Sequence, residues 1–373
     1  MATETSVRLE DPNAPTMNVA LKIWRFDSQT GERELRDYEV EAPEWACLLD
    51  VLDLIKDKVD GSLAYRKSCR MMICDSCGMR MDGRAVLACK ERMKPIVERG
   101  HVPVISAMGN LPILKDLVVE MDPFWNKVRA VKPWLDSGYD EVPEKERIVS
   151  QQRMNVIHKE ALCIMCGCCV SECNSMESDP DFLGPAALAK GFRFVGDVRD
   201  HADVERLNKL NEEHGIWDCT RCYFCNERCP KGVDPRDAIA KLGAESIKQG
   251  VDHDMGAKHA KWFVKSAETT GWLRETELVP KTQGVISAIK EVKFALKLFR
   301  HGKVPVPIPP HVAENVREAR ALHDLVRRQD RDGALGIVQG EHALGRIERT
   351  DWGGAKVDIA EVKPGEEPAP AGH

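Results

Sequence analysis

The hydrophobic period changes once within the first hundred residues, from that of strands to that of a helix. Apolar residues alternate with polar ones over 19–26 and again over 37–40, which predicts two half-buried strands. Over 47–58 they recur at helical spacing instead, so a helix is expected there, with Asp53 among its outward residues. Asp82-Gly83 is a signal for a hairpin turn. Strands, helix and hairpin together indicate a small α+β unit.

The pattern after Leu114 is helical, and prolines interrupt it from Phe124 onward. This part of the chain is therefore predicted to be mostly helical, with further helices over 147–162, 199–214 and 235–248. Beyond residue 255, an apolar stripe and a basic stripe run along 285–299. An extended, proline-rich linker over 304–310, a helix over 312–328 and a disordered last dozen residues are expected to follow.

These patterns predict an order of domains along the chain. The expected order is a flexible tail over 1–17, an α+β domain over 18–122, a helical domain over 123–255 and a helical extension over 256–373.

Composition narrows the class of protein. The 373 residues include 54 lysines and arginines and 60 aspartates and glutamates, and the resulting charge of −6 disfavours a nucleic-acid-binding surface. An apolar fraction of 43% suffices for a buried core. No apolar run reaches the ~18–20 residues of a membrane span. The first residues are neither basic nor apolar enough to be expected as a secretory signal.

The 14 cysteines are unevenly spread. All but Cys47 and Cys168 can be assigned to three tight groups, which is not the pattern of a large disulfide-bonded secreted protein. Grouped cysteines in a chain without a predicted signal indicate metal ligands. Cys47 and Cys168 are expected to be packed or free thiols.

The first group is Cys69, Cys74 and Cys77, followed by Cys89 after the hairpin. This C-x4-C-x2-C spacing with a distant fourth cysteine is typical of plant-type [2Fe–2S] ferredoxins. The alternative is a zinc site, but zinc sites usually pair two C-x2-C knuckles. The spacing therefore favours iron and sulfide.

The second and third groups are two C-x2-C-x2-C-x3-C runs. Two such runs are the two-cluster ferredoxin pattern, in which the fourth cysteine of each run binds the other run's cluster. One predicted ligand set is Cys163, Cys166, Cys169 and Cys229. The other predicted set is Cys173, Cys219, Cys222 and Cys225.

Motifs for catalysis or for binding of other ligands do not stand out in the sequence. The histidines lack metal-ligand spacing, and no nucleophile elbow, phosphate-binding glycine loop or paired carboxylates stand out. The chain is therefore expected to carry electrons without a substrate site of its own.

The order of the three groups resembles the iron–sulfur subunit of succinate dehydrogenase and fumarate reductase. The resemblance covers roughly residues 18–250. Besides the cysteine spacing it includes Ser68-Cys69-Arg70, Cys77-Gly78-Met79, residues 111–121, Gly184-Pro185-Ala186, Arg193-Phe194, residues 197–200 and Cys229-Pro230-Lys231-Gly232.

The resemblance implies an α+β fold, with an N-terminal β-grasp domain before an all-α ferredoxin domain that binds two cubane-type clusters. It also implies electron relay between the FAD of a flavoprotein subunit and a membrane quinone held by anchor subunits, with the [2Fe–2S] cluster nearest the flavin. The expected place is peripheral, on the cytoplasmic face of the cell's inner membrane. Such complexes serve the tricarboxylic acid cycle and the respiratory chain.

Three departures from that family limit what can be carried over. Asn174 to Ser178 follow Cys173 where many quinone-reducing members have a proline and an aromatic pair, and Thr220 stands where they have a histidine. Cys222 stands where they have a non-cysteine residue and a [3Fe–4S] cluster. A second [4Fe–4S] cluster is therefore expected, with [3Fe–4S] as the alternative if Cys222 is not a ligand.

The extra cysteine and the C-terminal extension are similar to non-classical members of the family, whose membrane partners resemble heterodisulfide reductase subunits. An alternative function is thus a thiol- or heterodisulfide-linked fumarate reductase, or another flavoprotein dehydrogenase. A zinc scaffold without redox function is a third interpretation. The basic amphipathic stretch from Val285 to Lys303 could contact a membrane surface or a partner subunit, or pack on its own domain.

Overall fold

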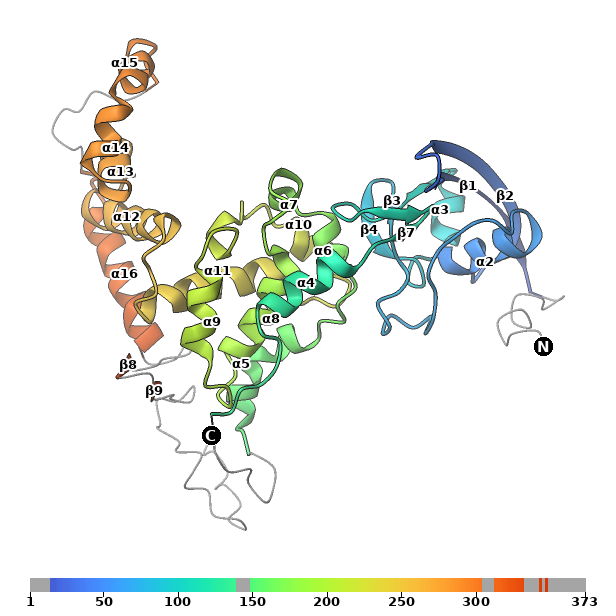
Figure 1. Cartoon of the computed structure of the whole chain (residues 1–373), viewed down its shortest axis with the longest axis horizontal. Coiled ribbons are helices and arrows are strands. Elements are labelled where there is room, and N and C mark those ends of the chain that lie inside the picture. The colour runs from blue at the N-terminus through green and yellow to red at the C-terminus, as the bar shows by residue number, and fades with distance from the viewer. Residues whose placement is uncertain (1–13, 139–147, 304–311, 332–341, 344–345, 348–373) are drawn as a thin grey trace. The chain divides into compact units, whose positions relative to one another are not determined.

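The computed structural model describes residues 14–138, 148–303, 312–331, 342–343 and 346–347 (Figure 1). The chain forms two compact units. Unit 1 comprises residues 1–133, 159–193 and 219–239, and unit 2 comprises 134–158, 194–218 and 240–373. All three cysteine groups belong to unit 1.

Unit 1 begins with a five-stranded sheet in the order β2-β1-β5-β3-β4. Strands β1 (Thr16–Phe26) and β2 (Arg33–Pro43) pair antiparallel along their whole length, and β1 pairs parallel with β5 (Val104–Ser106). Strands β3 (Gly78–Met81) and β4 (Arg84–Leu87) form the predicted hairpin at Asp82-Gly83. The predicted tail was wrong at its end, because Thr16 and Met17 already pair in β1.

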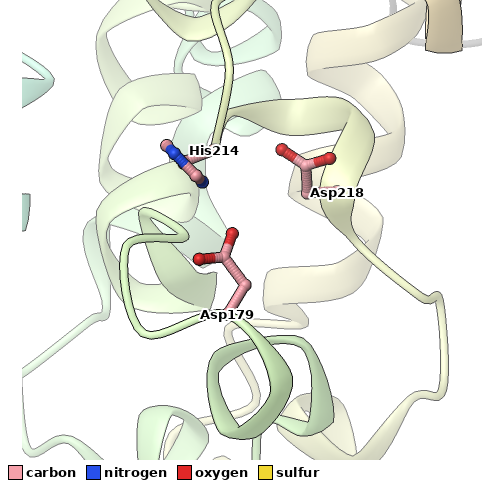
Figure 2. Close-up of side chains that lie close together, drawn as sticks. All are labelled: Asp179, His214 and Asp218. Atoms are coloured by element: carbon pink, nitrogen blue, oxygen red, sulfur yellow. The ribbon is translucent and has the colours of Figure 1, made fainter.

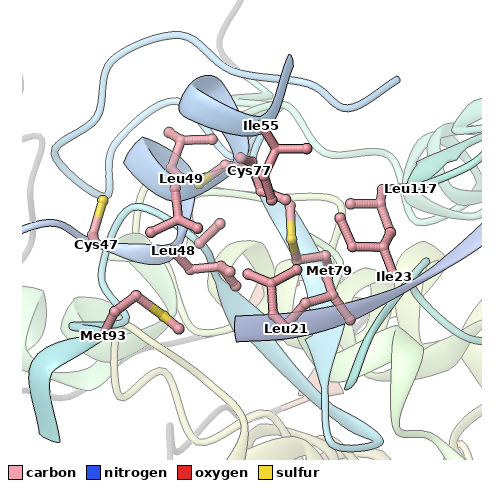
Figure 3. Close-up of a cluster of buried hydrophobic side chains, with 14 of the residues drawn as sticks. Leu21, Ile23, Cys47, Leu48, Leu49, Ile55, Cys77, Met79, Met93 and Leu117 are labelled. Carbon is pink, nitrogen blue, oxygen red and sulfur yellow. The ribbon is translucent and has the colours of Figure 1, made fainter. Parts of the chain in front are cut away.

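Helix α2 (Leu48–Lys58) lies against this sheet and supplies much of its core (Figure 3). Leu48, Leu49 and Ile55 are buried together with Leu21 and Ile23 of β1. The arrangement confirms the expected small α+β unit of strands, helix and hairpin. Cys47 is buried at the start of α2, and both its backbone N–H and its thiol donate to the Asp50 carboxylate at 2.9 Å.

The segment after Leu114 is not helical at first, contrary to the prediction. Short strands β6 (Ile113–Lys115) and β7 (Val118–Val119) pair with each other, and helix α4 begins only at Asp122 and ends at Ala130. The physical reason is a turn at Asp116, whose φ is +49° and whose side chain is buried. A tertiary partner for that carboxylate outweighs the local helical pattern.

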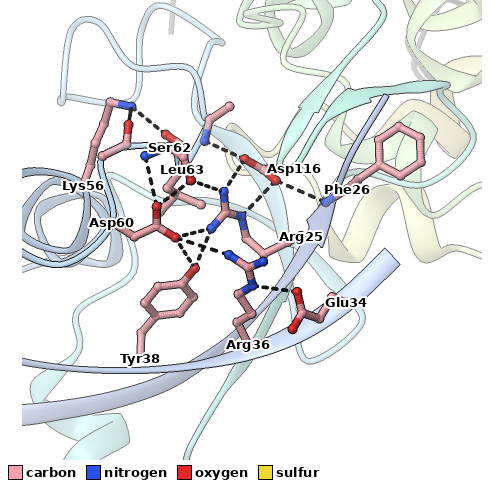
Figure 4. A network of polar contacts seen from close by, with 12 residues as sticks. Arg25, Phe26, Glu34, Arg36, Tyr38, Lys56, Asp60, Ser62, Leu63 and Asp116 are labelled. Carbon is pink, nitrogen blue, oxygen red and sulfur yellow. Dashed lines mark hydrogen bonds and ion pairs between the residues drawn. The ribbon is translucent and has the colours of Figure 1, made fainter. Parts of the chain in front are cut away.

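The partner of Asp116 is the buried guanidinium of Arg25 on β1 (Figure 4). Arg25 Nε donates to Asp116 Oδ1 at 2.9 Å, and its other nitrogens donate to Tyr38, Asp60 and Ser62. Asp116 also accepts the backbone N–H groups of Phe26 at 3.1 Å and of Ala64 at 2.8 Å. One cation thus fastens β1 to β2, to the loop after α2 and to the β6–β7 turn.

The remaining short elements of unit 1 surround the cysteine groups. They are α3 (Lys94–Glu98), α6 (Cys168–Ser171), α7 (Asn174–Ser178) and α10 (Phe224–Glu227). The longer helices of the middle of the chain are α5 (Gln151–Ala161), α8 (Gly184–Val195) and α11 (Pro235–Lys248), which have residues in both units, and α9 (Asp203–Leu210), which belongs to unit 2. The prediction for 235–248 is confirmed, and α5 lies within the predicted 147–162.

Helix α9 is shorter than the predicted 199–214 because side chains cap it at both ends. The Asp200 carboxylate accepts the backbone N–H of Ala202 at 3.0 Å and a guanidinium N–H of Arg206 at 2.7 Å, before and within the first turn. At the other end, Asn211 accepts the indole N–H of Trp217 at 2.6 Å. Trp217 belongs to the 3-10 helix η1 (Ile216–Asp218).

Unit 2 continues with a series of helices. They are α12 (Met255–Thr270), α13 (Glu275–Thr282), α14 (Val285–Lys290), α15 (Val292–Arg300) and α16 (Val316–Arg331), followed by the two-residue strands β8 (His342–Ala343) and β9 (Arg346–Ile347). The single helix predicted over 285–299 is interrupted at Glu291, where ψ is 0°. The proline-rich linker over 304–310 and the last dozen residues lie outside the described residues.

None of the helices among the described residues combines the length and hydropathy that crossing a bilayer requires.

The Arg25 network generates a prediction about stability. Hydrogen bonds from Ser62, Tyr38 and Arg25 outweigh burial and hold the pKa of Asp60 well below its usual range. A lowered pKa means that Asp60 stabilises the fold fully above its unfolded pKa of about 4 and loses that effect only at lower pH. Asp60→Asn should therefore lower the free energy of unfolding of the holo protein by about 1–3 kcal/mol.

The difference between wild type and Asp60→Asn should stay constant from about pH 8 to about pH 5, since the titration lies below that range. Anaerobic urea unfolding, followed by circular dichroism, measures it. Asp37→Asn is the matched control, because Asp37 forms an exposed ion pair with Lys22 and should change stability by less than about 1 kcal/mol. A difference that fades between pH 8 and pH 5 would contradict the assigned role of Asp60.

Candidate metal centres

The first cysteine group lies on the loop between α2 and β3. Arg70, Met72 and Asp75 adopt left-handed backbone conformations there, with φ of 57°, 60° and 64°. Such residues let a short loop curl tightly and turn several N–H groups toward one point. That point is the sulfur of Cys69, which accepts the backbone N–H groups of Met71, Ile73 and Cys74 at 3.3 Å.

The thiols of this loop have different electrostatic surroundings. Burial opposes ionisation of Cys74, but hydrogen bonds from Ser76 and from the Cys69 backbone outweigh it and lower its pKa to about 6. Burial raises the pKa of Cys77 to about 12, and the neighbouring Cys89 and Cys74 add to the rise. Cys89, the distant fourth member of the predicted set, is thus brought close to Cys77. Thiolates so close together repel each other unless a cation compensates them, which fits a metal site.

An ion-pair cluster anchors this loop to α2. Arg70 donates to Asp50 at 2.7 Å and also pairs with Asp53, while Lys67 reaches Asp53 at 2.8 Å. Asp53 is buried rather than outward, so that prediction was wrong. Its cationic partners and the hydroxyl of Tyr65 keep the carboxylate inside. Sequence reasoning missed the ion pair between Arg70 and Asp53, because the helical period of 47–58 contains no signal for it.

The second and third groups share one backbone conformation. Met165 and Arg221, at equivalent places in the two runs, have φ of 62° and 57°. Gly167 and Tyr223, also equivalent, have φ of 78° and 69°, and each begins a short helix, α6 or α10. A tyrosine in this region is unusual. The guanidinium of Arg236 lies over its ring at 4.4 Å from the centroid.

The fourth cysteine of the third run joins the second run. One cavity of unit 1 has Cys163, Cys166, Cys169 and Cys229 in its lining, together with apolar residues such as Ala186 and Ala189. Burial raises the pKa of Cys163, and the charges of Cys166 and Cys229 raise it further. Four soft sulfur donors around one enclosed space suit an iron–sulfur cluster.

The fourth cysteine of the second run joins the third run. Burial raises the pKa of Cys173, and the charges of Cys219 and Cys222 raise it further. Burial likewise raises the pKa of Cys225 to about 12, with Cys219, Cys173 and Cys222 adding to the rise. Each of the three therefore lies within electrostatic reach of Cys222. Cys222 is exposed, whereas Cys166 at the equivalent place is buried.

The second cysteine run and the sheet are tied together within unit 1. Arg80 on β3 donates to Glu172 at 2.7 Å and to the Ser171 hydroxyl at 3.1 Å. The side-chain amide of Asn110 donates to the carbonyls of Val170 at 2.8 Å and of Cys173 at 3.0 Å. The loop of the second run is thus held against β3, the strand that starts directly after Cys77.

Gly78 shows how closely the two parts approach. A Cβ atom at this position would lie 2.9 Å from the Met108 sulfur and 3.2 Å from the Cys166 carbonyl oxygen. Only a glycine fits there without displacing a neighbour. Gly78 follows Cys77 of the first group, so this contact links the first cysteine site to the second.

Two of the three departures from the resembled family, the segment after Cys173 and Thr220, contact each other. The hydroxyl of Ser175 in α7 is buried and accepts the backbone N–H of Thr220 at 3.1 Å. Ser175 and Thr220 thus share a polar contact next to Cys173 and Cys219 in the sequence.

Cysteines and histidines outside the three groups show no comparable assembly among the described residues. Cys168 is fully buried, and Cys47 caps α2 as described above. His214 precedes η1 and Asp218 ends it in unit 2, and the ligand atoms of these two residues lie within 4.8 Å of each other (Figure 2). Asp179, also labelled there, follows α7 in unit 1.

Comparison with known proteins agrees with this arrangement. The model of the 2Fe-2S iron-sulfur cluster binding domain matches residues 20–126, and the model of the 4Fe-4S dicluster domain matches residues 161–233. The fumarate reductase iron-sulfur subunit of Haemophilus influenzae is 38% identical over 251 residues, covering 64% of this chain and 96% of that protein.

Two further relatives extend the comparison. The 8-methylmenaquinol:fumarate reductase iron-sulfur subunit of Wolinella succinogenes is 32% identical over 287 residues, covering 76% of this chain and 89% of that protein. A solved structure titled as the Mycobacterium smegmatis Sdh1 complex in the apo form has a chain similar to this one. Its TM-score is 0.56 at 25% identity, covering 64% of this chain and 99% of that chain.

The sulfur-lined sites and the matched domains define an iron–sulfur protein with one 2Fe–2S domain and one 4Fe–4S dicluster domain. The predicted fold class and the predicted 2Fe–2S and 4Fe–4S domains are thereby confirmed. The chain belongs to the family of iron–sulfur subunits of fumarate reductase and succinate dehydrogenase, as the resemblance indicated. The individual ligand sets stay predictions.

Proposed function

We propose that this chain is the electron-transfer subunit of a fumarate reductase or succinate dehydrogenase complex. It would relay electrons between the FAD of a flavoprotein subunit and a quinone bound by membrane anchor subunits. The observation that carries the proposal is the contact of Gly78 with Cys166, which links the first cysteine loop to the dicluster loops in one compact unit. The family membership of the chain supports both the flavoprotein and the quinone as its electron-transfer partners.

The residues that would hold the clusters fall into three sets. Cys69, Cys74, Cys77 and Cys89 would hold [2Fe–2S], and Cys163, Cys166, Cys169 and Cys229 would hold [4Fe–4S]. Cys173, Cys219, Cys222 and Cys225 would hold a second [4Fe–4S]. When bound, the clusters supply one-electron steps to a reaction whose flavin exchanges two electrons with the dicarboxylate.

The chain's own residues contribute geometry and charge. Backbone N–H groups around Cys69 would stabilise negative charge on the first cluster's ligands and so favour its reduction. Arg80 on β3 and Asn110 hold the second cysteine loop against the strand that follows Cys77. The apolar lining near Ala186 and Ala189 keeps water from the second site and thereby lowers the local dielectric.

The proposed place of the subunit is peripheral, on the cytoplasmic face of the membrane, attached through its partner subunits. The proposed domain limits are 16–122 for the 2Fe–2S domain, which begins with β1, 123–255 for the dicluster domain and 256–373 for the extension. The family-model matches at 20–126 and 161–233 support the first two.

One observation favours a second candidate, a complex that works with a low-potential donor. The Wolinella relative is named for 8-methylmenaquinol, and its match covers more of this chain than the Haemophilus match does, 76% against 64%. The hydrogen bond between Ser175 and Thr220 also makes a polar contact at these positions. Many quinone-reducing members have a proline, an aromatic pair and a histidine there instead. The second candidate is therefore a complex with a menaquinol-type or thiol-linked donor.

Purification of the intact complex tests the relay. The tagged chain, isolated anaerobically from its native membranes, should bring down an FAD protein, and succinate should bleach the visible absorbance of the clusters. Fumarate should then restore the absorbance of the dithionite-reduced complex after excess dithionite is removed. Clusters that respond to neither dicarboxylate would overturn the proposed function. Cluster reduction by thiols but not by quinols would select the thiol-linked alternative.

The nature of the third cluster is a separate prediction. Arg221 and Tyr223 give the Cys222 loop the same left-handed pair as Met165 and Gly167 around Cys166, so the Cys222 thiol should reach the fourth iron. Anaerobically prepared, oxidised wild-type protein should show no [3Fe–4S] signal in electron paramagnetic resonance, whereas Cys222→Ser should create one and lose about one iron per chain.

Cys47→Ser is the matched control, because Cys47 is a buried thiol outside all three sets, and its spectrum should equal that of the wild type. A near-stoichiometric [3Fe–4S] signal in undamaged wild-type protein would refute the role of Cys222.

A further inference from the structure

Helices α14 and α15 present apolar side chains to solvent. In α15, Phe294, Leu296 and Phe299 are 58%, 52% and 45% exposed, and in α14 Ile286 and Ile289 are 75% and 66% exposed. No residue within either helix is buried. Isolated exposed apolar residues are ordinary, but a contiguous group of this kind marks an interaction surface.

Basic residues occupy one narrow side of α15. At 100° per residue, Lys293, Lys297 and Arg300 fall within one sector, and all six remaining positions of the helix are apolar. Such a helix has a wide apolar face bordered by cations that can extend toward water or phosphate groups.

The charge of this stretch opposes that of the whole chain. Residues 285–303 contain five lysines or arginines and one acid, Glu291, whereas the full chain has a formal charge of −6. An acidic protein as a whole is repelled by an anionic surface. Any attraction to such a surface must therefore come from a local basic cluster, and this stretch is one.

We propose that α14 and α15 bind in the plane of an anionic lipid bilayer, with the apolar face in the headgroup–acyl boundary and the basic side chains on lipid phosphates. A wide apolar face with lysine and arginine along its border is the composition of interfacial helices. A protein partner would be expected to leave a narrower apolar seam, with polar residues along both flanks. This surface binding is independent of the electron relay, since it uses no cysteine.

Flotation of the full-length holo protein with lipid vesicles tests the proposal. The protein should float with vesicles containing about 30% phosphatidylglycerol and not with pure phosphatidylcholine vesicles, and added salt should weaken the binding. Replacing Lys293, Lys297 and Arg300 by Gln should reduce the partition coefficient on the order of 100-fold, since each basic side chain near the surface contributes about a factor of 5.

A second variant, with two substitutions, separates the contribution of the apolar face from that of the charge. Val292→Gln with Phe299→Gln leaves the charge unchanged and should also abolish flotation. The matched control for charge replaces Lys58, Lys90 and Lys115 by Gln. The matched control for apolar area combines Val59→Gln with Val102→Gln. All five of these side chains are exposed in unit 1. Both controls should float like the wild type. Unchanged visible absorbance and circular dichroism show that each variant keeps its clusters and fold.

Failure of the wild-type protein to float with anionic vesicles would overturn the proposal, and so would equal flotation of the α15 variants and the wild type. If the protein does not float but the α15 variants lose the anchor subunits during detergent purification, the face is a protein interface and the lipid assignment is wrong. Each of these results is read without a dicarboxylate assay, so failure of the electron relay would be seen separately.

Discussion

The contact between Gly78 and the Cys166 carbonyl is the constraint on which the arrangement of the cysteine sites depends. A side chain at residue 78 would collide with the Met108 sulfur and with backbone of the second loop. The absence of a Cβ lets β3 lie directly against that loop. Arg80, two residues further along the strand, then fixes the register through Glu172 and Ser171. Close packing here is what would keep an electron's path from Cys77 to Cys166 short.

The thiols themselves explain why the loops need their clusters. Burial raises the pKa of Cys77, Cys169 and Cys225, so these thiols would be neutral without a metal. A cluster needs thiolates, and binding it must therefore release protons and compensate the buried negative charge. Left-handed residues such as Met165 and Arg221 bend each loop so that this charge gathers at one point. Cluster binding and loop conformation are thus coupled.

The sequence predicted those features that depend on local spacing. Helix α11 over 235–248, the Asp82-Gly83 hairpin and the three cysteine groups follow from period, turn chemistry and ligand spacing. Features that depend on a distant partner were missed. Asp53 was placed outward, but Arg70 and Lys67 hold it inside, and the helix expected after Leu114 gives way to a turn because Asp116 pairs with Arg25, ninety-one residues earlier. Single-sequence patterns do not contain such long-range ion pairs.

The most direct test of the account is the rate of electron transfer between the first and second clusters in a Gly78→Val variant. Electrons supplied to the [2Fe–2S] cluster can be followed by freeze-quench electron paramagnetic resonance as they reach the second cluster. The account predicts slower transfer with all clusters retained, because the valine pushes β3 away from the Cys166 loop. Gly61→Ala is the control, since a Cβ there meets only the Lys56 carbonyl at an ordinary 3.7 Å. An unchanged rate in a fully loaded Gly78→Val protein would contradict the central claim.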